Sequence, residues 1–116
     1  MGWDVELVDE NGNVVRVPPH TFGSNIVIGG SDRASTTITF NYSKFYYQVF
    51  GEKGFMTLNG MKAKDAIPLL EKAIEQLGTE RSESYWDATP GNAGFALLVL
   101  LSWAKLHPEA TFKIQP

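Results

Sequence analysis

Residues 89–108 decide the fold and read Thr-Pro-Gly-Asn-Ala-Gly-Phe-Ala-Leu-Leu-Val-Leu-Leu-Ser-Trp-Ala-Lys-Leu-His-Pro. Thr89 is a favourable N-cap, and Pro90 suits the first helical position, where a missing backbone N–H costs no hydrogen bond. Pro108 prevents the helix from continuing. The stretch therefore predicts a helix over about residues 90–107.

This helix lacks the polar face of a surface helix. Every residue from Phe95 to Leu101 is apolar, and polar side chains return only with Ser102 and Lys105. Because a helix that is apolar on all sides is normally buried, we expect it at the centre of the core, with Leu98 fully enclosed. The apolar run is about half of the ~20 residues that span a bilayer, so no membrane span is expected.

The composition is that of a globular domain. The chain has 116 residues, of which 43% are hydrophobic, and this predicts one domain over residues 1–116. It has no cysteine, which excludes thiolate metal sites and disulfides. The net charge is −3 without a basic block, so non-specific binding to nucleic acid is not expected. The first residues lack the pattern of a targeting signal, and we expect a cytoplasmic protein.

Alternating or β-branched stretches predict strands, and Asn11-Gly12 is a strong hairpin signal between the first two. The predicted strands are Trp3–Val8, Asn13–Val17, Asn25–Ile28, Ala34–Phe40 and Thr111–Ile114. We also expect a short extended piece over Phe55–Leu58.

Two further helices are predicted. Residues 63–77 place apolar side chains three and four positions apart, and Gly78 suits the end of this helix. Ser43 is a candidate cap for a short helix. Strands followed by helices and one last strand predict an α+β fold. We expect a mainly antiparallel sheet of about four to five strands with two or three helices on one face.

Side chains suited to catalysis are scarce. The two histidines, His20 and His107, lie far apart in the sequence and lack the neighbours of a metal site or a hydrolytic triad. The sequence therefore predicts no catalytic residue, no metal, no cofactor and no enzymatic activity.

A glycine loop, Gly29–Arg33, offers a candidate anion site. Its backbone N–H groups would form a nest with Arg33 as the countercharge. It lacks the Gly-Lys-Ser/Thr ending of a phosphate-binding loop, and a flexible connection between strands remains the alternative.

The densest aromatic patch is Asn41–Tyr47. If Phe45 and the apolar residues after it point inward, Lys44 and one of Tyr46 or Tyr47 are exposed, which suits contact with a protein or a planar ligand. The alternative is that the tyrosines only cover a sheet edge. The candidate binding residues are Arg33, Asn41, Tyr42, Lys44, Tyr46, Tyr47 and Trp86. A seven-residue strand is about 23 Å long, so it would hold the glycine loop and the patch apart.

Several segments together resemble a group of small uncharacterised proteins encoded by bacteriophages, mobile elements and their bacterial hosts. They are Ile38–Ser43, Phe50–Gly54, Ile67–Ile74, Tyr85-Trp86, Gly91-Asn92-Ala93 and His107–Ala110, and the resemblance covers most of the chain after about residue 25. It implies a viral or mobile-element accessory protein and no catalytic residue. Relatives often carry a basic pair where this chain has Gly94-Phe95.

Two functions follow as expectations. The first is a non-enzymatic accessory protein that acts as an inhibitor, by binding and blocking or sequestering a host protein in the bacterial cytoplasm, as in counter-defence. The alternative is a binding protein for a small anionic, nucleotide-type ligand that uses the Gly29–Arg33 loop and the Tyr42–Tyr47 patch. Self-association into a homo-oligomer is left open by the sequence.

Overall fold

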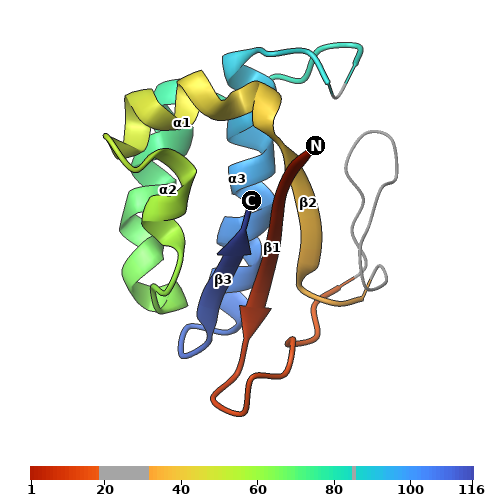
Figure 1. Cartoon of the computed structure of the whole chain (residues 1–116), viewed down its shortest axis with the longest axis vertical. Helices are drawn as coiled ribbons and strands as arrows, with labels where there is room; N and C mark the ends of the chain where they lie inside the picture. Colours follow the sequence, from red (N-terminus) through yellow and green to blue (C-terminus); the bar gives the residue numbers. More distant parts are fainter. Residues whose placement is uncertain (19–31, 85) are drawn as a thin grey trace.

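The structure of the protein is a computed structural model, which describes residues 1–18, 32–84 and 86–116 (Figure 1). Its regular elements follow one another as strands, helices and a last strand. They are β1 (Gly2–Val8), β2 (Ser35–Thr39), the 3₁₀ turn η1 (Phe40–Tyr42), α1 (Ser43–Phe50), the 3₁₀ turn η2 (Gly54–Leu58), α2 (Ala63–Leu77), α3 (Pro90–Leu106) and β3 (Thr111–Gln115). The predicted α+β class is confirmed.

The sheet is antiparallel, with the strand order β2-β1-β3. Its central strand is β1, where Trp3 faces Ile38 of β2 and Val5 faces Ile114 of β3. The alternation read from the sequence is confirmed, because Trp3, Val5 and Leu7 are buried while Asp4 is exposed. The inner side of this sheet therefore forms one wall of the core.

The described residues form three strands, not the four to five that were predicted. Residues 13–17 form only isolated bridges, Val8 with Val14 and Arg16 with Arg33. The backbone of Val15 lies between the ends of two strands, since its N–H donates to Leu7 and its carbonyl accepts from Ala34. The N–H of Val17 in turn donates to the carbonyl of Asp32, so residues 15–17 run beside 32–34, just before β2, and do not add a strand to the sheet. The predicted strand 25–28 lies outside the described residues.

The outer edge of β3 is covered by the chain that leads into α2. Phe112 donates to the carbonyl of Met61 and accepts from Gly60, and the N–H of Ile114 donates to the Asn59 side chain at 2.8 Å. The preceding Phe55–Leu58 forms the turn η2, so the predicted extended piece is wrong. The turn is favoured because both Phe55 and Leu58 reach the core from it.

α2 has the bounds that the sequence predicts, and Gly78 ends it with φ of 79°. It runs antiparallel to α3, because Gly78 at its end meets Gly94 near the start of α3, and Glu71 pairs with Lys105 at 3.8 Å. A Cβ at Gly94 would collide with the Gly78 carbonyl oxygen. The two helices therefore pack closely where α3 begins.

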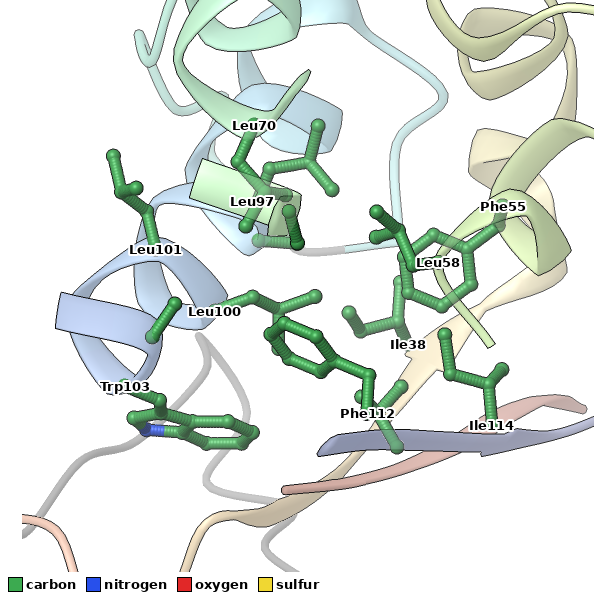
Figure 2. Close-up of a cluster of buried hydrophobic side chains, with 14 of the residues drawn as sticks. Ile38, Phe55, Leu58, Leu70, Leu97, Leu100, Leu101, Trp103, Phe112 and Ile114 are labelled. Carbon is green, nitrogen blue, oxygen red and sulfur yellow. The ribbon is translucent and has the colours of Figure 1, made fainter. Parts of the chain in front are cut away.

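The predicted cap of α3 is confirmed. Thr89 Oγ1 accepts a hydrogen bond from the N–H of Asn92 at 3.1 Å, and Pro90 is the first helical residue. The inward side of α3 carries the buried residues Leu97, Leu100 and Trp103; in Figure 2, Leu100 lies next to Phe112 of β3 and Leu97 next to Leu70 of α2. α3 is thus the main helix of the core.

Burial of α3 on all sides is not observed. Leu98 is 39% exposed and Leu106 is 54% exposed, so the expectation that Leu98 is enclosed is wrong. The sheet and α2 cover most of the circumference of α3 and leave a strip uncovered. Among the described residues, no helix is long and apolar enough to cross a membrane.

Candidate functional site

Two of the candidate tyrosines, Tyr42 and Tyr46, belong to the core. Both are fully buried, and their rings meet edge to face at 6.2 Å. Tyr46 also stacks on Phe55 at 5.0 Å and donates its hydroxyl to the carbonyl of Ala93 at 3.0 Å. They are four residues apart across the start of α1, which places both on its inner side. Their expected place in an exposed patch is corrected, because neither ring reaches solvent.

The opposite side of the same segment is exposed. Asn41, Lys44 and Tyr47 follow one another at intervals of three, and all three are exposed. Tyr47 is 56% exposed, with its ring lying against Gly54, where an added Cβ would stand 3.0 Å from the ring. Lys44 extends over the ring of Phe45 at 5.0 Å. The helical geometry of this segment thus places Tyr42 and Tyr46 in the core and Tyr47 on the surface.

Trp86 joins this surface from the loop between α2 and α3. The side-chain Nδ2 of Asn41 donates to the backbone carbonyl of Trp86 at 2.9 Å. The Trp86 side chain is 43% exposed. Asn41, Lys44, Tyr47 and Trp86 are called the aromatic surface below. Four of the seven candidate residues are therefore exposed, and one hydrogen bond links Asn41 to the backbone of Trp86.

Asn92, which reasoning from the sequence did not single out as a site residue, holds the Trp86 loop in place. It is buried at the start of α3, and its Oδ1 accepts from the N–H of Ser82 at 3.0 Å. Its Nδ2 donates to the carbonyls of Ser84 and Asp87, each at 3.0 Å. The available signal was an amide within the otherwise apolar start of the helix. One side chain thereby fixes both ends of the segment that carries Trp86.

Gly91 brings the same loop against α3. A Cβ at this position would collide with the carbonyl of Glu80, so only glycine allows the approach. Beside it, a cleft of about 440 Å³ lies between the end of α2 and the start of α3, with Glu80 and Arg81 on its wall. Arg81 also lies over the ring of Phe95 at 4.6 Å. The loop is therefore packed as well as hydrogen-bonded.

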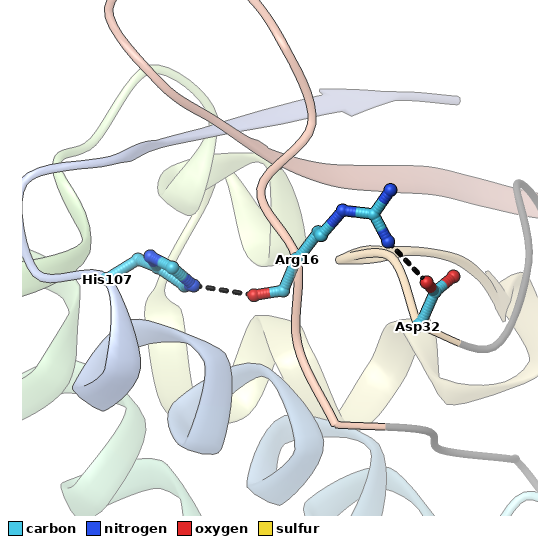
Figure 3. A network of polar contacts seen from close by, with 3 residues as sticks. All are labelled: Arg16, Asp32 and His107. Carbon is cyan, nitrogen blue, oxygen red and sulfur yellow. Dashed lines mark hydrogen bonds and ion pairs between the residues drawn. The ribbon is translucent and has the colours of Figure 1, made fainter.

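Arg33 lies apart from the aromatic surface. It precedes β2, whereas Asn41 follows the other end of that strand, as the expected strand length implied. Its neighbour Asp32 pairs with Arg16 at 2.6 Å, and the carbonyl of Arg16 lies 2.6 Å from the His107 ring nitrogen Nε2 (Figure 3). These contacts tie residue 16 to the end of α3. Gly29, Gly30 and Ser31, the rest of the candidate anion loop, lie outside the described residues.

A second cleft, of about 470 Å³, lies between the turn after β1 and the turn after α3. Glu109 stands on its wall, and the ammonium groups of Lys64 and Lys62, each 3.5 Å away, hold the pKa of this carboxyl below its usual value. Within the described parts of the chain, no cluster of three or more His, Asp or Glu side chains is placed to hold a metal. His20 lies outside them.

The exposed side chains of the aromatic surface are of the kinds that contact a binding partner. The aromatic surface offers two exposed aromatic side chains, an amide and an ammonium group, on η1, on α1 and on a loop that is hydrogen-bonded to η1. Such groups bind a partner through apolar area and hydrogen bonds. Comparison of the chain with protein-family models, with curated proteins and with solved structures finds no match.

Proposed function

We propose that this protein is a non-enzymatic binding protein that blocks or sequesters a protein of a bacterial host, using the aromatic surface. The observation that carries the proposal is Trp86. This large aromatic residue is 43% exposed on a loop whose backbone accepts hydrogen bonds from Asn92 and Asn41. Tryptophan and tyrosine are the residues that most often dominate the free energy of binding at protein interfaces.

The hydrogen bonds that hold the loop favour binding, because they reduce the free-energy cost of ordering it. A partner that orders a flexible loop loses part of its binding free energy to that ordering. Here the Asn92 side chain makes hydrogen bonds to the backbone of Ser82, Ser84 and Asp87 within the free protein. An exposed aromatic ring on such a segment is prepared for contact, because little further ordering is needed when the partner arrives.

A protein partner fits this arrangement better than a small ligand. Tyr42 and Tyr46 are buried, and Arg33 lies at the far end of β2 from Asn41, so these three of the expected nucleotide-binding residues do not meet at one exposed site. The two clefts are lined by other residues than Tyr47 and Trp86. The resemblance to proteins of bacteriophages and mobile elements supports a host protein as the partner.

The experiment is capture of host proteins on the immobilised protein, with the captured protein identified and its affinity then measured. We expect Trp86→Ala to weaken binding at least tenfold and Tyr47→Ala to weaken it less, with the melting temperature unchanged. Leu69→Ala is the matched control, because Leu69 is also an exposed apolar residue but lies on α2.

Two outcomes would count against the proposal. One is a double Trp86→Ala, Tyr47→Ala variant that binds the captured protein with unchanged affinity. The other is a nucleotide or another small anion that leaves the purified protein on denaturation in stoichiometric amount, which would favour the small-ligand function instead.

A further inference from the structure

Two Asn-Gly pairs occur in the chain, Asn11-Gly12 and Asn59-Gly60. An asparagine that precedes glycine is especially prone to spontaneous deamidation, because glycine has no Cβ to hinder the attack of its own backbone nitrogen on the asparagine side chain. Both glycines have a positive φ, of 80° at Gly12 and 84° at Gly60. Local sequence and glycine conformation therefore leave the two pairs alike, and their tertiary contacts decide which one reacts.

Asn11-Gly12 lies in an exposed turn that projects beyond the end of β1 (Figure 1). The Gly12 N–H closes this turn by donating to the carbonyl of Asp9 at 2.9 Å, and Asp9 Oδ1 accepts from the N–H groups of Asn11 and Asn13. Within the part of the chain that the structure describes, the side-chain amide of Asn11 has no hydrogen-bond partner. The amide is thus free to rotate, and opening the exposed turn releases the Gly12 N–H at little cost.

Asn59-Gly60 is held against β3 by both of the groups that would react. Asn59 Oδ1 accepts from the N–H of Ile114 at 2.8 Å, and the Gly60 N–H donates to the carbonyl of Phe112 at 2.8 Å. The N–H of Phe112 continues the contact by donating to the carbonyl of Met61 at 2.9 Å. Freeing the side-chain amide and the glycine nitrogen together therefore requires residues 59–61 to leave the edge of the sheet.

We propose that Asn11 is a site of spontaneous deamidation in the folded protein and that the sheet protects Asn59. The Gly12 backbone nitrogen loses its proton to hydroxide and attacks Asn11 Cγ. The Cγ–Nδ2 bond breaks, and ammonia leaves with a proton from water, which regenerates the hydroxide. Water then opens the cyclic imide: cleavage of the bond from Cγ to the Gly12 nitrogen gives aspartate, and cleavage of the bond from the main-chain carbonyl carbon gives isoaspartate. This inference does not depend on the proposed function.

The two products change the turn differently. Each carries a carboxylate in place of the Asn11 amide, beside Asp9 and Glu10, which already stand on the wall of the second cleft. In isoaspartate the backbone also runs through Cγ and is longer by one carbon. Because Asp9 accepts from three successive N–H groups of the turn, a longer backbone cannot keep all three bonds. We therefore expect the isoaspartate product to melt at a lower temperature than the aspartate product, which melting curves of the separated products measure.

The test is peptide mapping by mass spectrometry after the full chain has been incubated at mildly alkaline pH, below its melting temperature. Trypsin cleavage after Arg16 places Asn11 in the peptide 1–16, and cleavage after Lys53 and Lys62 places Asn59 in the peptide 54–62. We expect the first peptide to deamidate faster than the second by about tenfold or more, because opening an exposed turn costs less free energy than detaching the edge of a sheet. A sample digested at time zero corrects for deamidation during the digestion.

The matched control is Asn11→Gln, which keeps an uncharged amide at the exposed position but must form a larger ring to cyclise. The peptide 1–16 should then keep its mass, although Asn13 is still present in it, and the melting temperature should be unchanged. The second control is incubation in guanidinium chloride that unfolds the chain. The rates at Asn11 and Asn59 should converge there, because neither pair is then held by the fold.

Three results would overturn the proposal. The first is an Asn11 that reacts only after unfolding, or no faster than Asn59 in the folded protein. The second is a deamidation of the peptide 1–16 that persists in the Asn11→Gln variant. The third is a difference between the two sites that remains in guanidinium chloride, which would assign it to the neighbouring residues in the sequence and not to the fold.

Discussion

Asn92 shows how much of the surface depends on one side chain. Its amide donates to or accepts from four groups of the loop, namely Ser82 N–H, Ser82 Oγ, Ser84 O and Asp87 O. The flanking Gly91 lets the loop approach, and Thr89 caps the helix on which Asn92 sits. The structural roles of Gly91 and Asn92 thus explain why these residues occur in the segment Gly91-Asn92-Ala93, without reference to any activity.

Asn92→Ala should lower the free energy of unfolding by about 2–3 kcal/mol, because several partly buried backbone groups lose their partner at once. Urea denaturation followed by circular dichroism measures it. The control is Asn41→Ala, which removes one exposed hydrogen bond and should cost less than about 0.5 kcal/mol. Equal effects of the two variants would show that Asn92 does not hold the loop.

Thr36 carries the opposite kind of polar group. Among the described residues its buried hydroxyl oxygen has no hydrogen-bond partner. Thr36→Val keeps the shape of the side chain and removes the unsatisfied group, so we expect stability to rise by about 1–2 kcal/mol. Thermal and urea denaturation provide the measurement.

Thr37→Val is the matched control on the same strand. The hydroxyl of Thr37 donates to the Asp4 carboxylate at 3.0 Å, so its loss should leave stability unchanged or slightly lower. A Thr36→Val protein less stable than the Thr37→Val protein would contradict this account of the hydroxyl.

At the scale of elements, α3 combines two environments in one helix. Its ends follow local rules, with a threonine cap and a proline at the start. The burial of its sides depends on the neighbouring elements. The sheet and α2 cover one part of the helix surface, and the other part faces solvent. Neighbouring leucines of identical chemistry are therefore expected to respond differently to the same substitution.

Leu97→Asp should unfold the protein at 25 °C or leave it close to unfolding. The side chain is fully buried, and an uncompensated charge there costs several kcal/mol out of the roughly 5–15 that stabilise a domain. Leu98→Asp should cost only about 1 kcal/mol, because its side chain reaches water and the helix propensity of aspartate is the main loss. Melting curves of the two variants, measured in parallel, test this difference in stability. A similar loss of stability in both would contradict the exposed position of Leu98.

At the scale of the whole molecule, the aromatic surface is built from segments that lie far apart in the chain. It comprises residues of η1, of α1 and of the loop before α3. The loop is joined to η1 by the hydrogen bond from the Asn41 side chain to the Trp86 carbonyl.

The sequence alone determined the features that depend on neighbours along the chain. The end of α2 follows from Gly78 and the bounds of α3 follow from Thr89, Pro90 and Pro108, while the alternation in β1 and β3 follows from the period of a strand. The α+β class follows from the order of these elements. Tyr47 and Trp86 were also identified from the sequence as candidate contact residues, and both are exposed.

Only the tertiary structure decided which side of each element is covered. Tyr46 and Tyr47 are adjacent in the sequence, yet one ring is buried and the other exposed, because Phe55 and α3 lie on one side of α1 only. Leu98 is open because the sheet and α2 pack on other sides of α3. Residues 13–17 have the pattern of a strand but lie between the ends of β1 and β2. Burial depends on contacts between residues far apart in the chain, and no local pattern contains them.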